Sequence, residues 1–184
     1  MSASFDIDHN RLFGLLQDSL NEDSVQLRYD ANGGNSILFV YPNDEDAQYI
    51  QEAKRRFHDS AIFVDVAETL TEYQEMIGLE TFKELEEELG TEVYYRKGAT
   101  DTFYEYLVQR IAQATTQGKP VFLVGTSALA NKGFSNINIM EHEAVKKAKQ
   151  PLVYFYPSNI EGDKIYFLGD KNHVASKYRC RVIQ

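Results

Sequence analysis

The sequence predicts a single α/β domain, residues 1–184, folded as a three-layer sandwich around a mostly parallel, Rossmann-like central sheet. Segments with helical spacing separate short runs that are almost entirely apolar, as expected for parallel strands that helices cover on both faces. The 184 residues and the apolar fraction of 43% suit one globular core. The predicted, mutually parallel strands are residues 37–40, 62–64, 121–124 and 153–155.

The first elements lead up to the strand that begins near residue 36. Leucines at helical spacing predict a helix over residues 11–20. The alternation in residues 25–29 predicts a short strand, and the Asn-Gly-Gly-Asn sequence of residues 32–35 predicts a turn. Pro42 ends the next strand because proline cannot donate to a ladder.

The remaining elements alternate in type. Acids begin and bases end a predicted helix that runs from Asn43 or Asp44 to about Phe57, in the order that the helix dipole favours. Helices are also predicted over 68–77, with Met76 on its inward face, and over 81–89, 101–116 and 138–149, with Asp101 as the cap of the third. Half-exposed edge strands are predicted over 164–168 and 179–183.

Charge and cysteine content narrow the function classes. The formal net charge of −9 disfavours direct DNA binding. Two basic runs, Lys54-Arg55-Arg56 and Lys146-Lys147 with Lys149, lie near predicted helix ends, where cations complement the dipole. The single cysteine, Cys180, and the lack of a signal peptide or long apolar segment predict a cytoplasmic chain with no membrane association. The oligomeric state is left open.

A ligand site at the carboxyl ends of the strands is one hypothesis. Asp44 and Asp65 each follow a strand, as do Thr126 and Ser127, and in a parallel sheet these ends share one edge, with Ser158 nearby. Such a site would serve a nucleotide- or metal-dependent hydrolase or a phosphoryl-binding domain. However, acids are favoured in a first helical turn without any metal, and no G-x-G-x-x-G or Walker sequence is present. We therefore assign no metal and no cofactor.

No catalytic residue emerges from the sequence. The four histidines lack the i, i+4 spacing of a helical metal pair, and Cys180 has no histidine nearby in the chain. No G-x-S-x-G nucleophile elbow is present. The sequence favours a protein that is not an enzyme.

Three collinear stretches form a recognisable set. They are Phe39-Val40-Tyr41-Pro42-Asn43-Asp44-Glu45, then Pro120-Val121-Phe122-Leu123-Val124-Gly125-Thr126, then Pro151-Leu152-Val153-Tyr154-Phe155-Tyr156-Pro157 with Leu168-Gly169 and Tyr178-Arg179. Together they resemble the BrxB-like family of BREX bacteriophage-exclusion systems, a small domain of unknown function. Residues 126–135 lack the family's proline and arginine, and Ser158 replaces a glycine. The resemblance implies an accessory protein of anti-phage defence that works by protein–protein interaction beside a PglZ-like phosphatase-fold protein.

A partner-binding surface is predicted around the loop at residues 125–135. The loop is longer than most strand-to-helix connections, and long loops on a rigid scaffold are often functional. Phe134 is its large apolar residue, which is either an interface anchor or a core residue. Asn131, Lys132 and Tyr156 are the further candidates for contact with a partner.

Overall fold

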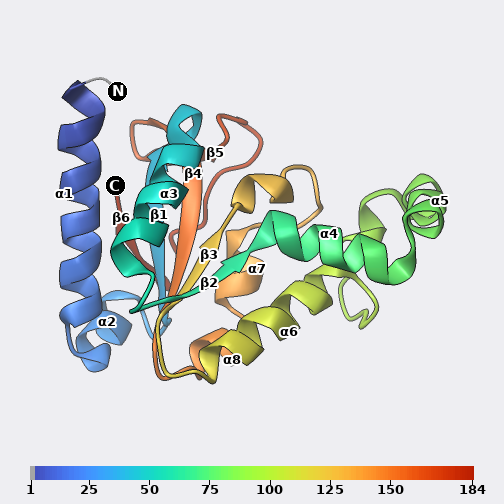
Figure 1. Ribbon diagram of the computed structural model, residues 1–184, viewed down its shortest axis with the longest axis horizontal. Coiled ribbons are helices and arrows are strands. Elements are labelled where there is room, and N and C mark those ends of the chain that lie inside the picture. Colours follow the sequence, from blue (N-terminus) through green and yellow to red (C-terminus); the bar gives the residue numbers. More distant parts are fainter. Residues whose placement is uncertain (1–2) are drawn as a thin grey trace.

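The computed structural model describes the backbone of residues 3–184 and the side chains of residues 9–184. Its central sheet has the order β2-β3-β4-β1-β6, and these five strands are mutually parallel (Figure 1). The strands are β1 (Ser36–Pro42), β2 (Ile62–Asp65), β3 (Val121–Val124), β4 (Leu152–Glu161) and β6 (Cys180–Ile183). The predicted α/β class and the parallel arrangement of the four apolar runs are confirmed.

One strand runs against the others. β5 (Lys164–Phe167) pairs antiparallel with the end of β4, so that Ser158 faces Phe167 and Glu161 faces Lys164. β6 lies at one edge of the sheet beside β1, with Ser36 in register with Cys180. The two predicted edge strands are therefore present, one as a hairpin arm and one as a parallel edge.

Alternate side chains of the strands enter two separate cores. On one face, Phe39, Phe122 and Phe155 pack against α1 (Ala3–Asn21) and α3 (Asp46–Phe57). On the other face, Leu38, Leu123 and Tyr154 belong to the core that the remaining long helices cover. This burial on both faces explains why the strands are apolar at nearly every position.

The second face is covered by a series of helices (Figure 1). They are α4 (Val66–Ile77), α5 (Leu79–Leu89), α6 (Phe103–Thr115), α7 (Asn136–Met140) and α8 (Glu143–Lys146). The short 3-10 turns are η1 (Asn43–Glu45), η2 (Gly90–Val93) and η3 (Thr126–Leu129). Figure 1 shows α5 and the end of α4 extending away from the sheet, on the side opposite α1.

The predicted strand at residues 25–29 is wrong, because this segment is helix α2 (Ser24–Asp30). The carboxylate of Asp23 accepts the N–H of Val25 at 2.9 Å and so caps the helix. Arg28 then donates to the carbonyls of Lys146 and Ala148, each at 2.8 Å, which fastens α2 to the rest of the molecule. Five alternating residues were too few to distinguish a strand from two turns of helix.

Several predicted helices have different limits, including α1, which begins at Ala3 and not near residue 11. The helix predicted over residues 138–149 is divided into α7 and α8, because His142 is extended and its Nδ1 accepts the N–H of Ala144 at 3.2 Å. The cap of α6 is Thr102, not Asp101. Within the part of the chain that the structure describes, no helix is both long and apolar enough to cross a membrane.

Candidate functional site

The three stretches that carry the family resemblance meet at the carboxyl edge of the sheet. β3, β4 and β1 are neighbours, and Tyr41 is in register with Pro157. The hydroxyl of Thr126 donates to the carbonyl of Phe155 at 2.5 Å, which joins the end of β3 to β4. Residues that are far apart in the sequence therefore form one continuous edge, and this edge is the candidate functional site.

Asp65 has a structural role at this edge. Its Oδ1 accepts the N–H groups of Ala67 at 3.0 Å and Glu68 at 3.3 Å, so it caps α4. Lys54 lies 3.7 Å from its other oxygen. An N-cap carboxylate is a common way to satisfy the first N–H groups of a helix.

Asp44 lies too far along the sheet to share a site with Asp65. Asp44 is exposed in η1, directly after β1, whereas Asp65 follows β2. Strands β3 and β4 lie between β1 and β2 in the sheet. Among the described residues, no group of three or more His, Cys, Asp or Glu side chains is placed to hold a metal ion. The predicted convergence of the two aspartates is therefore wrong.

The hydroxyl side chains of the hypothetical ligand site also differ in their surroundings. Thr126 is fully buried and its hydroxyl is engaged by β4, while Ser127 is half-buried in η3. Ser158 is buried within β4, three residues before the strand ends, and its Oγ makes no hydrogen bond to the described residues. Of the three, only Thr126 is shown to join two strands through its side chain.

A hollow of about 490 Å³ does lie at the carboxyl ends of β1 and β4. Leu12, Tyr41, Tyr49 and Ile160 supply much of its wall. The rings of Tyr41 and Tyr49 stack with centroids 4.5 Å apart, and the Tyr41 hydroxyl donates to Asp46 at 2.7 Å. Burial, with Asp46 beside it, raises the pKa of Tyr41 well above its ordinary value. Sequence reasoning missed this hollow because it depends on the lateral order of the strands.

The loop candidates lie at a different place from Tyr156. Asn131, Lys132 and Phe134 line a second hollow of about 460 Å³ together with Tyr95. Phe134 is only 6% exposed, and its ring lies 5.7 Å from Tyr95 and 5.2 Å from Tyr104. Of the two alternatives for Phe134, the structure favours the core residue.

The other three partner-binding candidates differ in exposure. Asn131 is exposed, and Lys132 is half-buried with its ammonium 3.9 Å from the ring centre of Tyr94. Tyr156 is fully buried and packs against Phe167 with ring centroids 5.0 Å apart. Burial thus removes the Tyr156 side chain from the surface, and Phe134 offers a partner only a small exposed area.

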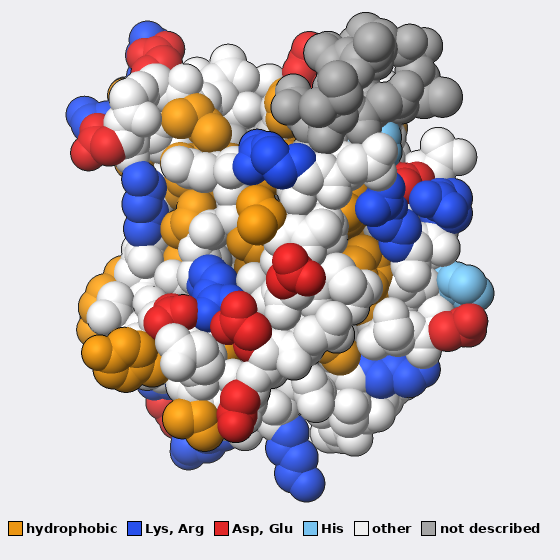
Figure 2. Space-filling model, turned by 90° about the vertical axis from the view of Figure 1, so that its left-hand side faces the viewer, with side chains coloured by type: hydrophobic (Ala, Val, Ile, Leu, Met, Phe, Trp, Pro, Cys, Tyr) orange, Lys and Arg blue, Asp and Glu red, His pale blue; other side chains and the backbone are white. Residues whose placement is uncertain are grey.

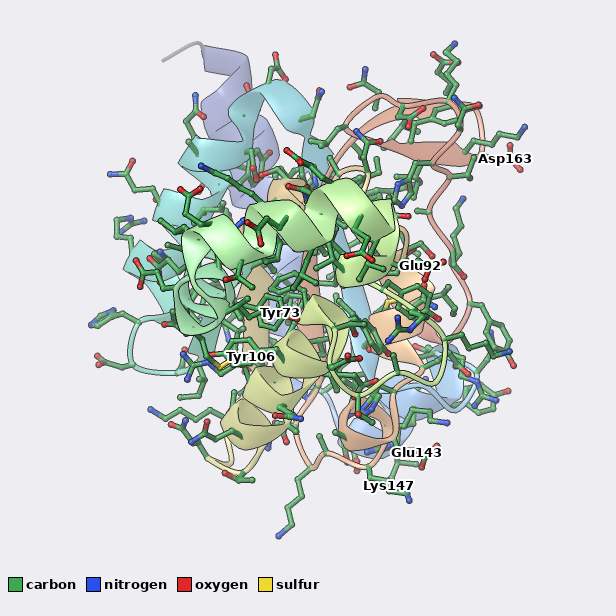
Figure 3. All side chains as sticks on the ribbon, turned by 90° about the vertical axis from the view of Figure 1, so that its right-hand side faces the viewer. Tyr73, Glu92, Tyr106, Glu143, Lys147 and Asp163 are labelled. Atoms are coloured by element: carbon green, nitrogen blue, oxygen red, sulfur yellow. The ribbon has the colours of Figure 1, made fainter. Side chains whose placement is uncertain are left out.

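Both basic runs are matched by nearby acids. Glu52 lies 2.7 Å from Arg55 and 2.6 Å from Arg56, and these hydrogen bonds lower the pKa of its carboxyl to about 2. Glu143 is paired with Lys146 at 2.6 Å and Lys147 at 3.0 Å, which also lowers its pKa to about 2. Figure 3 shows Glu143 and Lys147 beside each other. Neither run presents a cluster of unmatched cations for a nucleic acid.

One prediction about the end of α4 is wrong. Met76 was predicted to face inward, yet it is 63% exposed at the end of α4. Leu79, which follows the break at Gly78, is 56% exposed. Two large apolar side chains, at the end of α4 and at the beginning of the acidic helix α5, therefore lie on the surface.

No protein-family model, curated protein or solved structure matches the chain. The fold and the contacts described above therefore define its class: an α/β protein with a mostly parallel, Rossmann-like sheet.

Proposed function

We propose that this chain is an accessory component of a BREX-type anti-phage defence system, that it acts by binding other proteins, and that its partner is a PglZ-like phosphatase-fold protein. In this proposal the chain catalyses no reaction of its own. The proposal rests on the resemblance of its three collinear stretches to the BrxB-like family.

The observation that supports the proposal most is the meeting of these stretches at one edge of the sheet. Tyr41 and Pro157 are paired in register, and Thr126 is bonded to β4. The last matched pair, Tyr178-Arg179, also takes part in contacts within the fold. Arg179 lies 3.0 Å from Glu141, and its carbonyl oxygen closely approaches Gly34. A resemblance whose residues contact one another describes a shared fold better than scattered short matches do.

The polar residues near this edge support a binding role over a catalytic one. Asp65 caps a helix, Thr126 joins two strands, and Asp44 is separated from both by the order of the strands. A catalytic site needs a nucleophile or base within hydrogen-bond reach of its partner.

The test is a binding measurement with the PglZ-like protein encoded beside the chain in its native defence system. The two proteins are purified separately and examined together by light scattering and calorimetry. We expect a stable complex, and we expect that deleting the chain from the system abolishes protection against phage. Two purified proteins that fail to associate at micromolar concentration, together with full protection after deletion, would contradict the proposal.

The second candidate is the nucleotide- or metal-dependent hydrolase or phosphoryl-binding domain, which the hollow at the ends of β1 and β4 favours. A ligand present at a hundred times its Kd stabilises a protein by about 2.7 kcal/mol, which is visible in a melting curve. We expect no shift with ATP and Mg²⁺. A clear shift that Ser158→Ala or Asp46→Asn removes would favour this candidate instead.

A further inference from the structure

A groove runs between α4, the following helix α5 and the beginning of α6. It has a volume of about 530 Å³, and its apolar wall includes Tyr73, Met76, Ile77, Leu85 and Tyr106. The rings of Tyr73 and Tyr106 lie against each other with centroids 5.4 Å apart. Figure 3 shows these two tyrosines between α4 and α6.

The rim of this groove exposes apolar surface to water. Met76 lines it and is exposed, and Leu79, two residues after the lining residue Ile77, is the exposed first residue of α5. Burying such side chains contributes about 25 cal/mol per Å² of apolar surface removed from water. Methionine is also flexible and polarisable, so it fits several shapes of apolar partner.

The opposite side of the molecule is different. Figure 2 shows the face that carries α1, where apolar side chains form small groups among polar and charged ones. Val25 and Tyr29 of α2 are exposed, but they line none of the hollows described above. The groove beside α4 therefore combines exposure with a concave shape, which α2 does not.

Much of the chain's negative charge lies on α4 and α5, the two helices that form one side of the groove. Residues 66–89 contain eight glutamates and one lysine, Lys83, a formal charge of −7 out of the −9 of the chain. The eight are Glu68, Glu72, Glu75, Glu80, Glu84, Glu86, Glu87 and Glu88. Two arginines near the groove are already paired, Arg110 with Glu72 and Arg96 with Asp101. Positive charge around an apolar centre would therefore complement these two helices.

The backbone of the groove restricts the occupant further. Its long walls are helices, whose N–H and C=O groups are bonded within each helix. An extended peptide would find few backbone partners there, and each unpaired buried group would weaken its binding. A helix satisfies its own backbone and presents an apolar stripe, as in other complexes in which a helix lies in a groove.

We infer that the groove between α4, α5 and α6 docks a basic amphipathic helix of a protein partner. This inference deepens the proposed function, on which it rests for the existence of a partner. A second copy of the chain would bring two surfaces of charge −7 together, and nucleic acids and anionic membranes carry the same sign. A basic helix is the occupant whose shape and charge both match the groove.

The first experiment uses a synthetic helical peptide of roughly 18 residues, with leucines at i, i+3, i+4 and i+7, lysines elsewhere and one tryptophan on the apolar face. The chain contains no tryptophan, so the peptide is the only source of indole fluorescence in the mixture. We expect a blue shift and saturable binding that weakens as salt is added. A peptide with glutamates in place of lysines, and a scrambled peptide of the same composition, are not expected to bind.

Variants locate the site. We expect Met76→Asp and Leu79→Asp to weaken peptide binding at least about tenfold while their melting curves stay near that of the wild type, because both residues are exposed. The matched control is Val25→Asp, an exposed apolar residue of α2, which is expected to bind like the wild type. Equal binding by all four proteins would overturn the inference.

The same variants separate this inference from the proposed function. If the PglZ-like protein binds the wild type and both groove variants equally, the proposed function stands and the docking site is wrong. If the peptide binds at the groove but the PglZ-like protein does not bind at all, the groove stands and the proposed partner is wrong. Loss of both interactions in Met76→Asp and Leu79→Asp, with Val25→Asp unaffected, supports the two together.

Discussion

Asp65 and Gly125 touch across the ends of β2 and β3: a Cβ atom at Gly125 would lie 2.5 Å from Oδ1 of Asp65. Gly125 also has a positive φ of 64°, a conformation that other residues adopt at a penalty. The carboxylate that caps α4 is thus held against the turn that leaves β3. The absence of a side chain at Gly125 therefore lets the ends of β2 and β3 approach each other closely.

Gly125→Ala is therefore expected to destabilise the protein by at least about 2 kcal/mol, from backbone strain and from displacement of Asp65. Chemical denaturation measures the effect. Gly118→Ala is the control, since Gly118 has a φ of 74° but a Cβ there would meet no atom within 4 Å. If both variants lost the same stability, the contact with Asp65 would have no part in the effect.

Phe134→Ala should remove a buried ring from its contacts with Tyr95 and Tyr104. The expected loss is about 3–5 kcal/mol, which corresponds to a fall in melting temperature of roughly 10 °C. Tyr29→Ala, at a residue that is 80% exposed, should melt within about 0.5 kcal/mol of the wild type. If Phe134→Ala melted at the same temperature as Tyr29→Ala, the result would contradict the core position of Phe134.

Asn35 fastens the segment before β4 from inside the molecule. Its Nδ2 donates to the carbonyls of Val145, Ala148 and Gln150, each at 3.0 Å. Asn35→Ala leaves these buried acceptors without a donor and should destabilise the protein by about 1–3 kcal/mol. Asn35→Asp should destabilise the protein more near neutral pH, because a carboxylate, which can only accept, would then face the three carbonyl oxygens. Thermal melts compare both with the exposed Asn172→Asp, which is expected to be neutral.

The ion pairs of Glu52 give a defined pH dependence. The pKa of Glu52 in the folded protein is about 2, below the ordinary value of 4.5. The contribution of its ion pairs to the stability of the folded protein is therefore complete above about pH 4.5 and is lost as the pH falls toward about 2. Glu52→Gln should therefore be less stable than the wild type by about 1 kcal/mol near neutral pH, and the difference should shrink below about pH 4.5. Urea denaturation at several pH values measures it, with Glu87→Gln on α5 as the control. A difference that stays constant down to about pH 2 would contradict the ion pairing.

Cys180 is expected to be unreactive in the folded protein. The residue is buried in β6, and burial raises the pKa of its thiol to about 12. Because the thiolate is the reactive form, a disulfide reagent near pH 8 should label the native protein far more slowly than the protein in denaturing urea. Rapid labelling of the native protein would show that β6 leaves the sheet readily.

The sheet could be predicted from the sequence because its physical cause is local. Strands that are buried on both faces are apolar at nearly every position. The runs at residues 37–40 and 121–124 have this composition. The order of the strands could not be predicted in this way, because β1 pairs with residues that lie more than 100 positions away. Helix α2 was missed for a different reason: its cap, Asp23, decides between helix and strand, and a period of two over five residues does not.

The candidate site shows the same limit. Asp44 and Asp65 both follow strands, as predicted, but the two strands that separate them are visible only in three dimensions. The burial of Phe134 depends on Tyr95 and Tyr104, which lie in other parts of the chain. The groove has one local signal in the sequence, the series of glutamates on both sides of Met76 and Leu79, but acidic residues on a helix are also typical of a face that only contacts water.

The position of β1 has a consequence for how the chain folds during synthesis. β1 is made early, yet both of its neighbours in the sheet, β4 and β6, are made more than 100 residues later. Contacts between such distant segments form slowly. Until β4 and β6 have been synthesised, the apolar segment from Ser36 to Pro42 has no neighbouring strand to pair with. Unpaired apolar strands tend to associate with other chains. The nascent chain therefore passes through a long interval in which the ribosome's surroundings, and the chaperones present there, decide how much of it reaches the folded state.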